Sequence, residues 1–283
     1  MSDAVRYFTD FLGGDPDIRD IDAGDLRRFI IALQEKKAFS NHPMTRTRDK
    51  PVSPATVANY TRAIKSFFSF LAREELLEEN SMRKVKIPKA PLKVMPMFTE
   101  PELERLLAKP DKKSHEGYRN YTLMLTLIDT AIRLSELTGL CLQDVDLTNG
   151  YLRIMGKGEK ERYVPVGAKL SKVLLKYQMN HRARDTGCES FFLTRDGRPL
   201  AQKKVQDLVM VYGRKTGIKK RCSPHTFRST SAVLYLRNGG DPFTLQKKLG
   251  HSSLAMTRRY SELADSDVRA AHLKYSPADR LRA

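Results

Sequence analysis

The chain has 283 residues, enough for two ordinary domains with a core each, and its 51 Lys+Arg against 33 Asp+Glu give a net charge of +18. This charge indicates a polyanionic partner, although a merely soluble basic protein would show it too, and three scattered cysteines argue against a disulfide framework and for a reducing compartment. No signal-peptide pattern opens the chain and no apolar run approaches the roughly 18 residues of a membrane span, so we expect a cytoplasmic protein without a membrane partner.

Residues 1–82 are predicted to form a helical domain. Apolar side chains recur at helical spacing over residues 4–12 and 22–36, which predicts two helices there. Residues 37–52 then form a basic loop, which is either a contact to a DNA backbone or an ordinary solvated loop.

A third helix is predicted to begin at Ser53-Pro54, because serine caps a helix and proline suits its first turn. Apolar residues follow at three- and four-residue steps, so one face of this helix belongs to the core. Arg62 and Lys65 lie mostly away from that face. They are either plain surface charges or contacts to a ligand.

Residues 83–98 are predicted to be an extended basic linker between two domains. The stretch has no acidic residue and contains three prolines, which remove backbone donors and resist helix. Such a linker can follow phosphates and let two domains clamp a duplex. Its cations are Arg83, Lys84, Lys86, Lys89 and Lys93.

Residues 99–283 carry most of the positive charge, with 34 Lys+Arg against 20 Asp+Glu. A capping box at Thr99 starts a helix, and Asn149-Gly150 signals a hairpin within a three-stranded antiparallel sheet over residues 145–166. Ser223 caps a helix that ends at Gly239-Gly240. Further helices are predicted over 117–132, 169–180, 202–216 and 265–275.

Three motifs in this half bring together a tyrosine, histidines and arginines. Thr130–Leu137 contains Arg133 and Glu136, the helix after Ser223 carries His225 and Arg228 on one face, and Gly250–Tyr260 contains His251 and Tyr260. A tyrosine hydroxyl is a poor nucleophile at its free pKa of about 10. Attack on a phosphodiester needs cations around the phosphate, which the arginines can supply. Glu136 could brace Arg133, or form only a local ion pair.

These motifs resemble those of the tyrosine recombinase (integrase) family. The Thr-Gly-x-Arg-x-x-Glu-Leu box occurs with Ala131 for glycine, the His-x-x-Arg box follows, and the Gly-His box has threonine six and tyrosine nine residues after the histidine. Ser229 stands where a histidine is common in the family. A lysine is expected in a hairpin turn, and Lys157 between two glycines fits it, with Lys160 as the rival.

The resemblance implies a mainly helical fold with a small antiparallel sheet: a helical core-binding (SAM-like) DNA-binding domain at 1–82, a linker at 83–98 and a catalytic domain at 99–283. The N-terminal helix and linker would contact DNA through Arg62, Lys65, Arg83, Lys84 and Lys86. The partner would be double-stranded DNA with a specific recombination site. Four subunits, monomeric when free, would act on two such sites at the nucleoid.

The implied reaction breaks and rejoins DNA through a 3′-phosphotyrosyl intermediate and a Holliday junction, without a metal or other cofactor. Tyr260 would be the nucleophile, and Arg133 and Arg228 would hold the non-bridging oxygens. His225 would assist removal of the tyrosine proton or bond the phosphate, and His251 would donate to a phosphate oxygen. Lys157 would protonate the leaving 5′ oxygen. Glu136 would support Arg133.

Other functions remain open on the sequence alone. A type IB topoisomerase-like enzyme would use the same nucleophile as a monomer, and a regulator would bind DNA without cutting it. A metal hydrolase would need Cys222, His225 and His251, but the spacing of metal-binding motifs is lacking. The short N-terminus favours a Xer-like recombinase or mobile-element resolvase over an integrase with an arm-binding domain. The helix at 265–275 would pack locally or on a neighbouring subunit.

Overall fold

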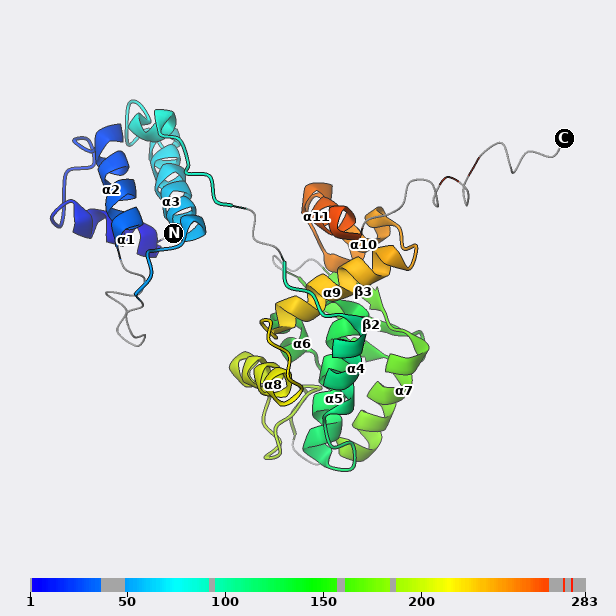
Figure 1. Cartoon of the computed structure of the whole chain (residues 1–283). Coiled ribbons are helices and arrows are strands. Elements are labelled where there is room, and N and C mark those ends of the chain that lie inside the picture. The colour runs from blue at the N-terminus through cyan, green and yellow to red at the C-terminus, as the bar shows by residue number, and fades with distance from the viewer. Residues whose placement is uncertain are drawn as a thin grey trace. The chain divides into compact units, whose positions relative to one another are not determined.

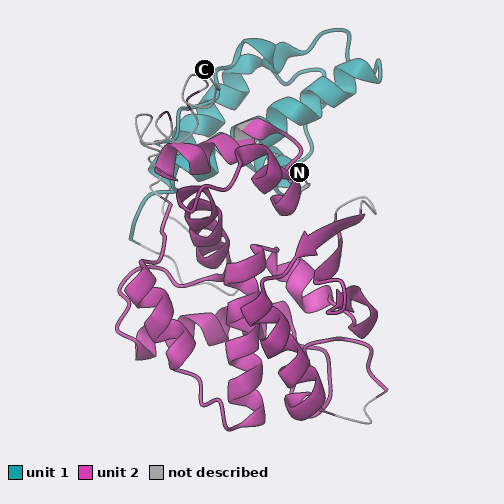
Figure 2. Ribbon diagram, turned by 90° about the vertical axis from the view of Figure 1, so that its right-hand side faces the viewer, with its two compact units in different colours: residues 1–94 teal, residues 95–283 magenta. Residues whose placement is uncertain are grey.

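The computed structural model describes residues 2–36, 49–91, 95–156, 161–183 and 187–264, together with 272 and 276. It divides into two compact units, Met1–Val94 and Met95–Ala283, coloured teal and magenta in Figure 2. The prediction of a mainly helical chain with one small antiparallel sheet is confirmed (Figure 1). None of the helices within the described ranges is long and apolar enough to cross a membrane.

Several expectations fall outside these residues. They are the greater part of the basic loop, the linker residue Lys93, the hairpin lysines Lys157 and Lys160, and the helix expected at 265–275. They stay predictions from the sequence.

The first unit is built on α1 (Ser2–Phe11), α2 (Ala23–Glu35) and α3 (Pro54–Arg73). The predicted helices are confirmed to within two residues at their ends. Ser53 caps α3 by accepting the Thr56 amide at 3.2 Å. Among the described residues, the apolar core of this unit holds seven side chains that are at most 1% exposed: Phe8, Leu26, Phe29, Val57, Ile64, Phe68 and Met82.

The extended conformation expected from residue 83 onward is wrong for its first part. Ser81–Lys84 form a 3₁₀ turn, which begins where the Asn80 side chain accepts the Met82 amide at 3.0 Å. Met82 and Val85 are 0% and 4% exposed in the core of the first unit. Their three-residue spacing suits a 3₁₀ turn, in which such positions eclipse, so apolar burial overrides the basic composition here.

The second unit begins with α4 (Glu100–Ala108), α5 (His115–Thr130) and α6 (Leu134–Gly139), followed by a 3₁₀ turn at Leu142–Asp144. Helix α5 lies against α9 (Pro224–Arg237), and most of its residues are buried. Three threonine hydroxyls of α5 donate to carbonyls one turn earlier, which satisfies them inside the core. The remaining helices are α7 (Ala168–Lys176), extended by a π turn at Tyr177–His181, α8 (Gln202–Lys215), α10 (Pro242–Leu249) and α11 (Leu254–Ala264).

The predicted three-stranded sheet is confirmed, with β1 (Val145–Asp146), β2 (Tyr151–Met155) and β3 (Glu161–Pro165) in that order. Leu152 pairs with Val164, and both are fully buried. Ile154 pairs with Arg162 in the same register. Because paired residues share one face of a sheet, Arg162 lies on the buried side, where an arginine needs partners.

A smaller apolar cluster lies between α9, α10 and α11 and contains the predicted nucleophile. Tyr260 is 4% exposed and packs with small and branched side chains from all three helices and from the end of α5. Its neighbours in the cluster are Ala131, Ala232, Val233, Leu245, Leu249 and Ala264.

Candidate active site

The structure brings Arg133, Arg228, His251 and Tyr260 to one place from four elements. Arg133 precedes α6, Arg228 lies in α9, His251 follows α10 and Tyr260 lies in α11. Arg228 Nη2 is 3.2 Å from His251 Nε2, and the rings of His251 and Tyr260 stack with centroids 6.1 Å apart. Residues separated by more than a hundred positions along the chain therefore meet.

The turn after α5 begins the site. Ala131 has φ +56°, the left-handed conformation that favours glycine, at the position where the family motif has glycine. The turn aims the Ala131 carbonyl at Arg228, whose Nη1 donates to it at 2.6 Å. The strain of about 1–2 kcal/mol is offset in part by burial of the alanine methyl in the cluster that contains Tyr260, which contributes about 0.8 kcal/mol. This departure from the motif therefore leaves the catalytic geometry in place.

The C-terminal end of α10 gathers three arginines. The amides of Gly250 and His251 close the helix by bonding the carbonyls of residues 247 and 246, so the next three carbonyls need other donors. Each of these carbonyls accepts from a different arginine at the negative end of the helix dipole. The pairs are Arg162 Nε to Lys248 O at 3.1 Å, Arg228 Nη2 to Leu249 O at 2.8 Å, and Arg133 Nη2 to Gly250 O at 3.3 Å.

Gly250 permits this gathering in two ways. It has φ +63°, and a Cβ there would lie 3.2 Å from Cζ of Arg162. Gly217 ends α8 with φ +73° and has no atom within 4 Å of such a Cβ. Both glycines thus have a left-handed conformation that would strain an alanine, and they differ only in what an added Cβ would contact.

Gly250→Ala is expected to destabilise the protein more than Gly217→Ala. Both substitutions cost about 1–2 kcal/mol of left-handed strain, and displacement of the Arg162 guanidinium adds about 1 kcal/mol at Gly250 alone. Urea unfolding of both variants measures the difference, and DNA cleavage should slow only for Gly250→Ala. Equal destabilisation would mean that the guanidinium yields freely.

Glu136 joins two of the arginines. Its side chain is 5% exposed and accepts a two-pronged bond from Arg162, with Nη1 at 3.0 Å and Nη2 at 2.8 Å. It also accepts from Arg133 through Nη1 at 2.8 Å and through the backbone amide at 2.7 Å. Burial alone would raise the pKa of Glu136, but the bonds from Arg162 and Arg133 lower it to about 2.

Glu136 should make stability depend on pH below 4.5. Its folded pKa lies below the ordinary 4.5, so the carboxylate stabilises the fold fully above pH 4.5 and this contribution is lost as pH falls through 2. The free energy of unfolding of the wild type should exceed that of Glu136→Gln by about 1–3 kcal/mol at pH 7, after discounting solvent screening. At pH 3 the difference should be less than half as large. Urea unfolding at pH 7, 5 and 3 measures this, with the exposed Glu262→Gln as control. A difference independent of pH would contradict the low pKa.

His251 is held on both ring nitrogens. Nδ1 lies 3.0 Å from the hydroxyl of the fully buried Thr257, and Nε2 faces Arg228. Burial, followed by the charges of Arg228, Arg133 and Arg162, lowers the pKa of His251 to about 4. The spacing of the Gly-His box follows from this geometry, because Thr257 and Tyr260 lie one turn apart on the face of α11 toward the histidine.

Arg228 is 6% exposed. Burial lowers its pKa to about 10, and the charge of Arg133 contributes in the same direction. It stays charged at neutral pH, with two carbonyls and a histidine around it. A guanidinium held in this way is poised to accept an anion that offsets its desolvation.

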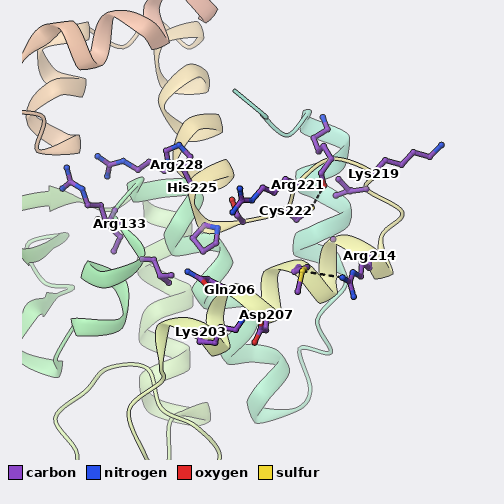
Figure 3. Close-up of a pocket in the computed structure, with 18 residues that line it drawn as sticks. Arg133, Lys203, Gln206, Asp207, Arg214, Lys219, Arg221, Cys222, His225 and Arg228 are labelled. Carbon is purple, nitrogen blue, oxygen red and sulfur yellow. Dashed lines mark hydrogen bonds and ion pairs between the residues drawn. The ribbon is translucent and has the colours of Figure 1, made fainter. Parts of the chain in front are cut away.

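His225 lies on the first turn of α9 beside a strongly basic cavity of about 590 Å³ (Figure 3). Arg133 and Arg228 line it together with side chains of α8 and the loop before α9. Desolvation of the ring, then the charges of Arg228 and other arginines, lower the pKa of His225. The other cations along the cavity are Lys203, Arg214, Lys219, Lys220 and Arg221, with Asp207 as the acidic residue.

Cys222, His225 and His251, the residues considered for a metal hydrolase, do not form a metal-binding cluster. Within the described ranges, no group of three histidine, cysteine or acidic side chains could hold a metal ion. The Cys222 thiol contacts the Lys220 carbonyl at 3.6 Å, while His251 bonds Thr257 and Arg228.

The candidate DNA contacts of the first unit differ in their surroundings. Arg62 is exposed and donates to Asn59 at 2.8 Å. The Lys65 amine instead donates to the carbonyls of Arg83, at 3.0 Å, and Val85, so it ties the 3₁₀ turn to α3. The side chains of Arg83, Lys84 and Lys86 are exposed.

The motifs did not single out Arg162. The alternation of β3 was the available signal, since it places Arg162 on the same face as the buried Val164. An arginine predicted to face a core requires acceptors there, and Glu136 and the Lys248 carbonyl are those acceptors.

The helical unit, the small sheet and the tyrosine among arginines and histidines are the arrangement of a tyrosine recombinase. Residues 96–267 match the model of the phage integrase family. Tyrosine recombinase XerD of Staphylococcus aureus strain Mu50 is 33% identical over 232 residues, covering 81% of this chain and 79% of that protein. XerD of Staphylococcus haemolyticus is 29% identical over 265 residues, covering 89% and 90%.

Solved structures agree with this. The XerH site-specific recombinase bound to difH substrate, a pre-cleavage complex, is 25% identical with a TM-score of 0.68, covering 98% of this chain and 76% of that chain. The XerA recombinase is 26% identical with a TM-score of 0.56, covering 99% and 90%. The chain belongs to the phage integrase family and is a tyrosine recombinase, an enzyme that breaks and rejoins DNA strands.

Proposed function

We propose that this chain is a site-specific recombinase in which Tyr260 cuts double-stranded DNA and forms a 3′-phosphotyrosyl intermediate. The observation that carries the proposal is the meeting of Tyr260 and His251 with Arg228 and Arg133 at the end of α10. The relatives named XerD and XerH are recombinases, which favours this function over a relaxing enzyme or a non-cutting regulator.

Arg133 and Arg228 are assigned to the two non-bridging oxygens of the scissile phosphate. The Arg133 side chain is 41% exposed and keeps part of its guanidinium open, while Arg228 brings a buried charge. As the bond from Tyr260 to phosphorus forms and the bond to the 5′ oxygen breaks, negative charge builds on those oxygens. Two fixed guanidinium groups stabilise that charge, and their forked donors match its geometry.

The proton transfers are assigned to three side chains. Desolvation of the ring and the charges of nearby arginines lower the pKa of His225, which favours the neutral form that can accept the Tyr260 proton. In the structure Nε2 of His251 accepts from Arg228, which puts the ring proton on Nδ1 toward Thr257. When a phosphate oxygen takes that arginine donor, His251 can donate from Nε2 to the phosphate while the Thr257 hydroxyl donates to Nδ1. Lys157 is assigned to protonate the leaving 5′ oxygen. The released strand end is then a 5′ hydroxyl, and rejoining reverses these steps.

Lys157→Ala should slow cleavage by about 10²- to 10⁴-fold, because an alkoxide is a poor leaving group without its proton. A substrate with sulfur at the bridging 5′ position needs no such proton, so the variant should recover most of its rate on it. Arg133→Ala should not recover, since the non-bridging charge stays unsupported.

Single-turnover cleavage of the two substrates gives both comparisons, and Lys160→Ala is the matched variant from the same turn. A Lys157→Ala variant that is equally slow on sulfur would show that Lys157 is not the acid. Rescue of Lys160→Ala instead would assign the role to Lys160.

DNA binding by the first unit is proposed to use Arg62, Arg83, Lys84 and Lys86. Their exposure supports this role. Lys65 was expected to join them, and its bonds to the 3₁₀ turn support a structural role beside any contact to DNA. We further propose that four subunits hold two recombination sites and that the strand exchange passes through a Holliday junction.

A plasmid assay tests the proposed function. The target sequence would first be selected from random DNA, and plasmids with one or two copies would then be incubated with the protein in EDTA. Recombinant products from the two-site plasmid alone support the proposal. Relaxation of the one-site plasmid without recombination would favour the topoisomerase-like alternative, and binding without any covalent complex would favour the regulator.

A further inference from the structure

We infer that Arg162 is a positioning residue for DNA cleavage: it holds Glu136, and through Glu136 it fixes the guanidinium of Arg133 that faces the phosphate. The inference rests on the proposed cleavage chemistry. It goes beyond the family motifs, which contain Arg133 and Glu136 but not this strand residue.

The donors of Arg162 point into the protein. Its side chain is 14% exposed, against 41% for Arg133. Nη1 and Nη2 each donate to one oxygen of Glu136, and Nε donates to the Lys248 carbonyl. Because both terminal nitrogens of Arg162 already donate to the Glu136 carboxylate, Arg162 can influence the reaction only through its partners.

Arg162 is itself fixed from three sides. It lies on the buried face of β3 opposite Ile154, it spans to α6 through Glu136, and it spans to α10 through the Lys248 carbonyl. The missing side chain of Gly250 lets the backbone lie against its guanidinium. Arg162 therefore connects β3 to the start of α6 and to the end of α10.

The consequence for Arg133 follows from the shared carboxylate. Glu136 gives one oxygen to Nη1 of Arg133 and the other to its backbone amide. With Arg162 in place, the carboxylate has one orientation and stays ionised, so the Arg133 side chain has one orientation too. Without Arg162, the carboxylate can rotate with Arg133 and the guanidinium loses its fixed direction toward the phosphate.

The same connection reaches the predicted general acid. Met155 and Glu161 are the paired ends of β2 and β3, and the stretch of sequence that contains Lys157 connects them. Arg162 is the next residue of β3. It therefore anchors the base of this hairpin to the element that carries Arg133.

Cleavage of a nicked duplex, at saturating DNA and in a single turnover, tests the inference. Arg162→Met should lower the cleavage rate by about 10- to 100-fold, the usual effect of removing a partner that orients a reacting group, while DNA affinity changes by less than about two-fold. Arg162→Lys keeps one charged donor and should recover part of the rate. The matched control is Arg153→Met on β2, which removes an arginine that is paired to Asp144 and Glu161 and not to Glu136.

Two comparisons separate positioning from general loss of structure. Combining Arg162→Met with Glu136→Gln should slow cleavage no more than the slower single variant, because both remove one connection. A methylphosphonate at the scissile position carries no charge for Arg133 to balance, so the defect of Arg162→Met should shrink at least about five-fold on it. If Arg162→Met fails to fold, Arg162→Lys carries both comparisons.

Three results would each overturn the inference. The rate losses of the two single variants could multiply in the double variant, or Arg162→Met could lose the same rate on the phosphate and the methylphosphonate substrates. Alternatively, Arg153→Met could cleave as slowly as Arg162→Met. The wild-type protein in the same assay tests the proposed function separately. A wild type that forms no covalent complex removes the proposed function, whereas an active wild type with an unimpaired Arg162→Met removes only the role of Arg162.

Discussion

Tyr260→Phe is expected to form no covalent complex with DNA while its affinity for DNA stays within about two-fold of wild type, because phosphate contacts by cations dominate binding. The change removes only the oxygen that is proposed to attack phosphorus. Loss of a nucleophile lowers turnover by about 10⁴-fold or more in enzymes whose residues act as a unit. The measurement is a denaturing gel of the protein on a nicked duplex, where the second strand end diffuses away and covalent product accumulates.

The fold should tolerate this change. The Tyr260 ring packs in the apolar cluster between α9, α10 and α11, and phenylalanine fills the same space, so stability should change by less than about 1.5 kcal/mol. Tyr235→Phe, which removes a hydroxyl beside the same cluster, is the matched control and should cleave normally. A covalent band from Tyr260→Phe would assign the nucleophile to another tyrosine, such as Tyr275.

Arg228→Lys is expected to slow cleavage by about 10²- to 10³-fold although it keeps the positive charge. Arg228 divides its donors between the carbonyls of Ala131 and Leu249 and the ring of His251. An ammonium has its three donors on one atom and cannot span these acceptors and a phosphate oxygen together. The buried carbonyl that loses its donor should also cost about 1–3 kcal/mol of unfolding free energy.

Single-turnover cleavage and urea unfolding measure the two effects. Arg237→Lys is the control, because Arg237 lies in the same helix, is exposed and makes one bond to the Leu263 carbonyl. If Arg228→Lys cleaved at the wild-type rate, the role of Arg228 would be only structural, to connect α5, α9 and α10. Loss of DNA binding in this variant would place its main contact in binding and not in the transition state.

The predicted elements that match the structure depend on short-range chemistry. Ser53, Thr99 and Ser223 each cap a helix that follows at once, and Asn149-Gly150 closes a hairpin whose strands flank it. Caps, turns and hydrophobic periodicity involve residues within a few positions of one another, so the interacting residues can be identified in the sequence. Fold class and family followed from them and from the motifs.

The contacts that the sequence did not show depend on distant partners. Basic composition and prolines indicated an extended linker from residue 83 onward, but Ser81–Lys84 form a 3₁₀ turn because Met82 and Val85 are covered by helices that precede them in the chain. The carbonyls that the Lys65 amine bonds lie 18 and 20 residues further along the chain, so the sequence did not show this contact, and the contact of Lys65 to DNA stays a prediction. Neither contact leaves a periodic trace in the local sequence.

The sequence by itself determined the fold class, the family and the residues of the proposed catalytic set, since these rest on local patterns and on the order of motifs. The tertiary structure alone decided how the set is held. Carbonyls 248–250 collect three arginines because α10 ends in a left-handed glycine, and Arg162 meets Glu136 because β3 turns that face inward. Burial and hydrogen bonding are properties of the folded chain, and they, not the motifs, set the pKa of Glu136 and His251.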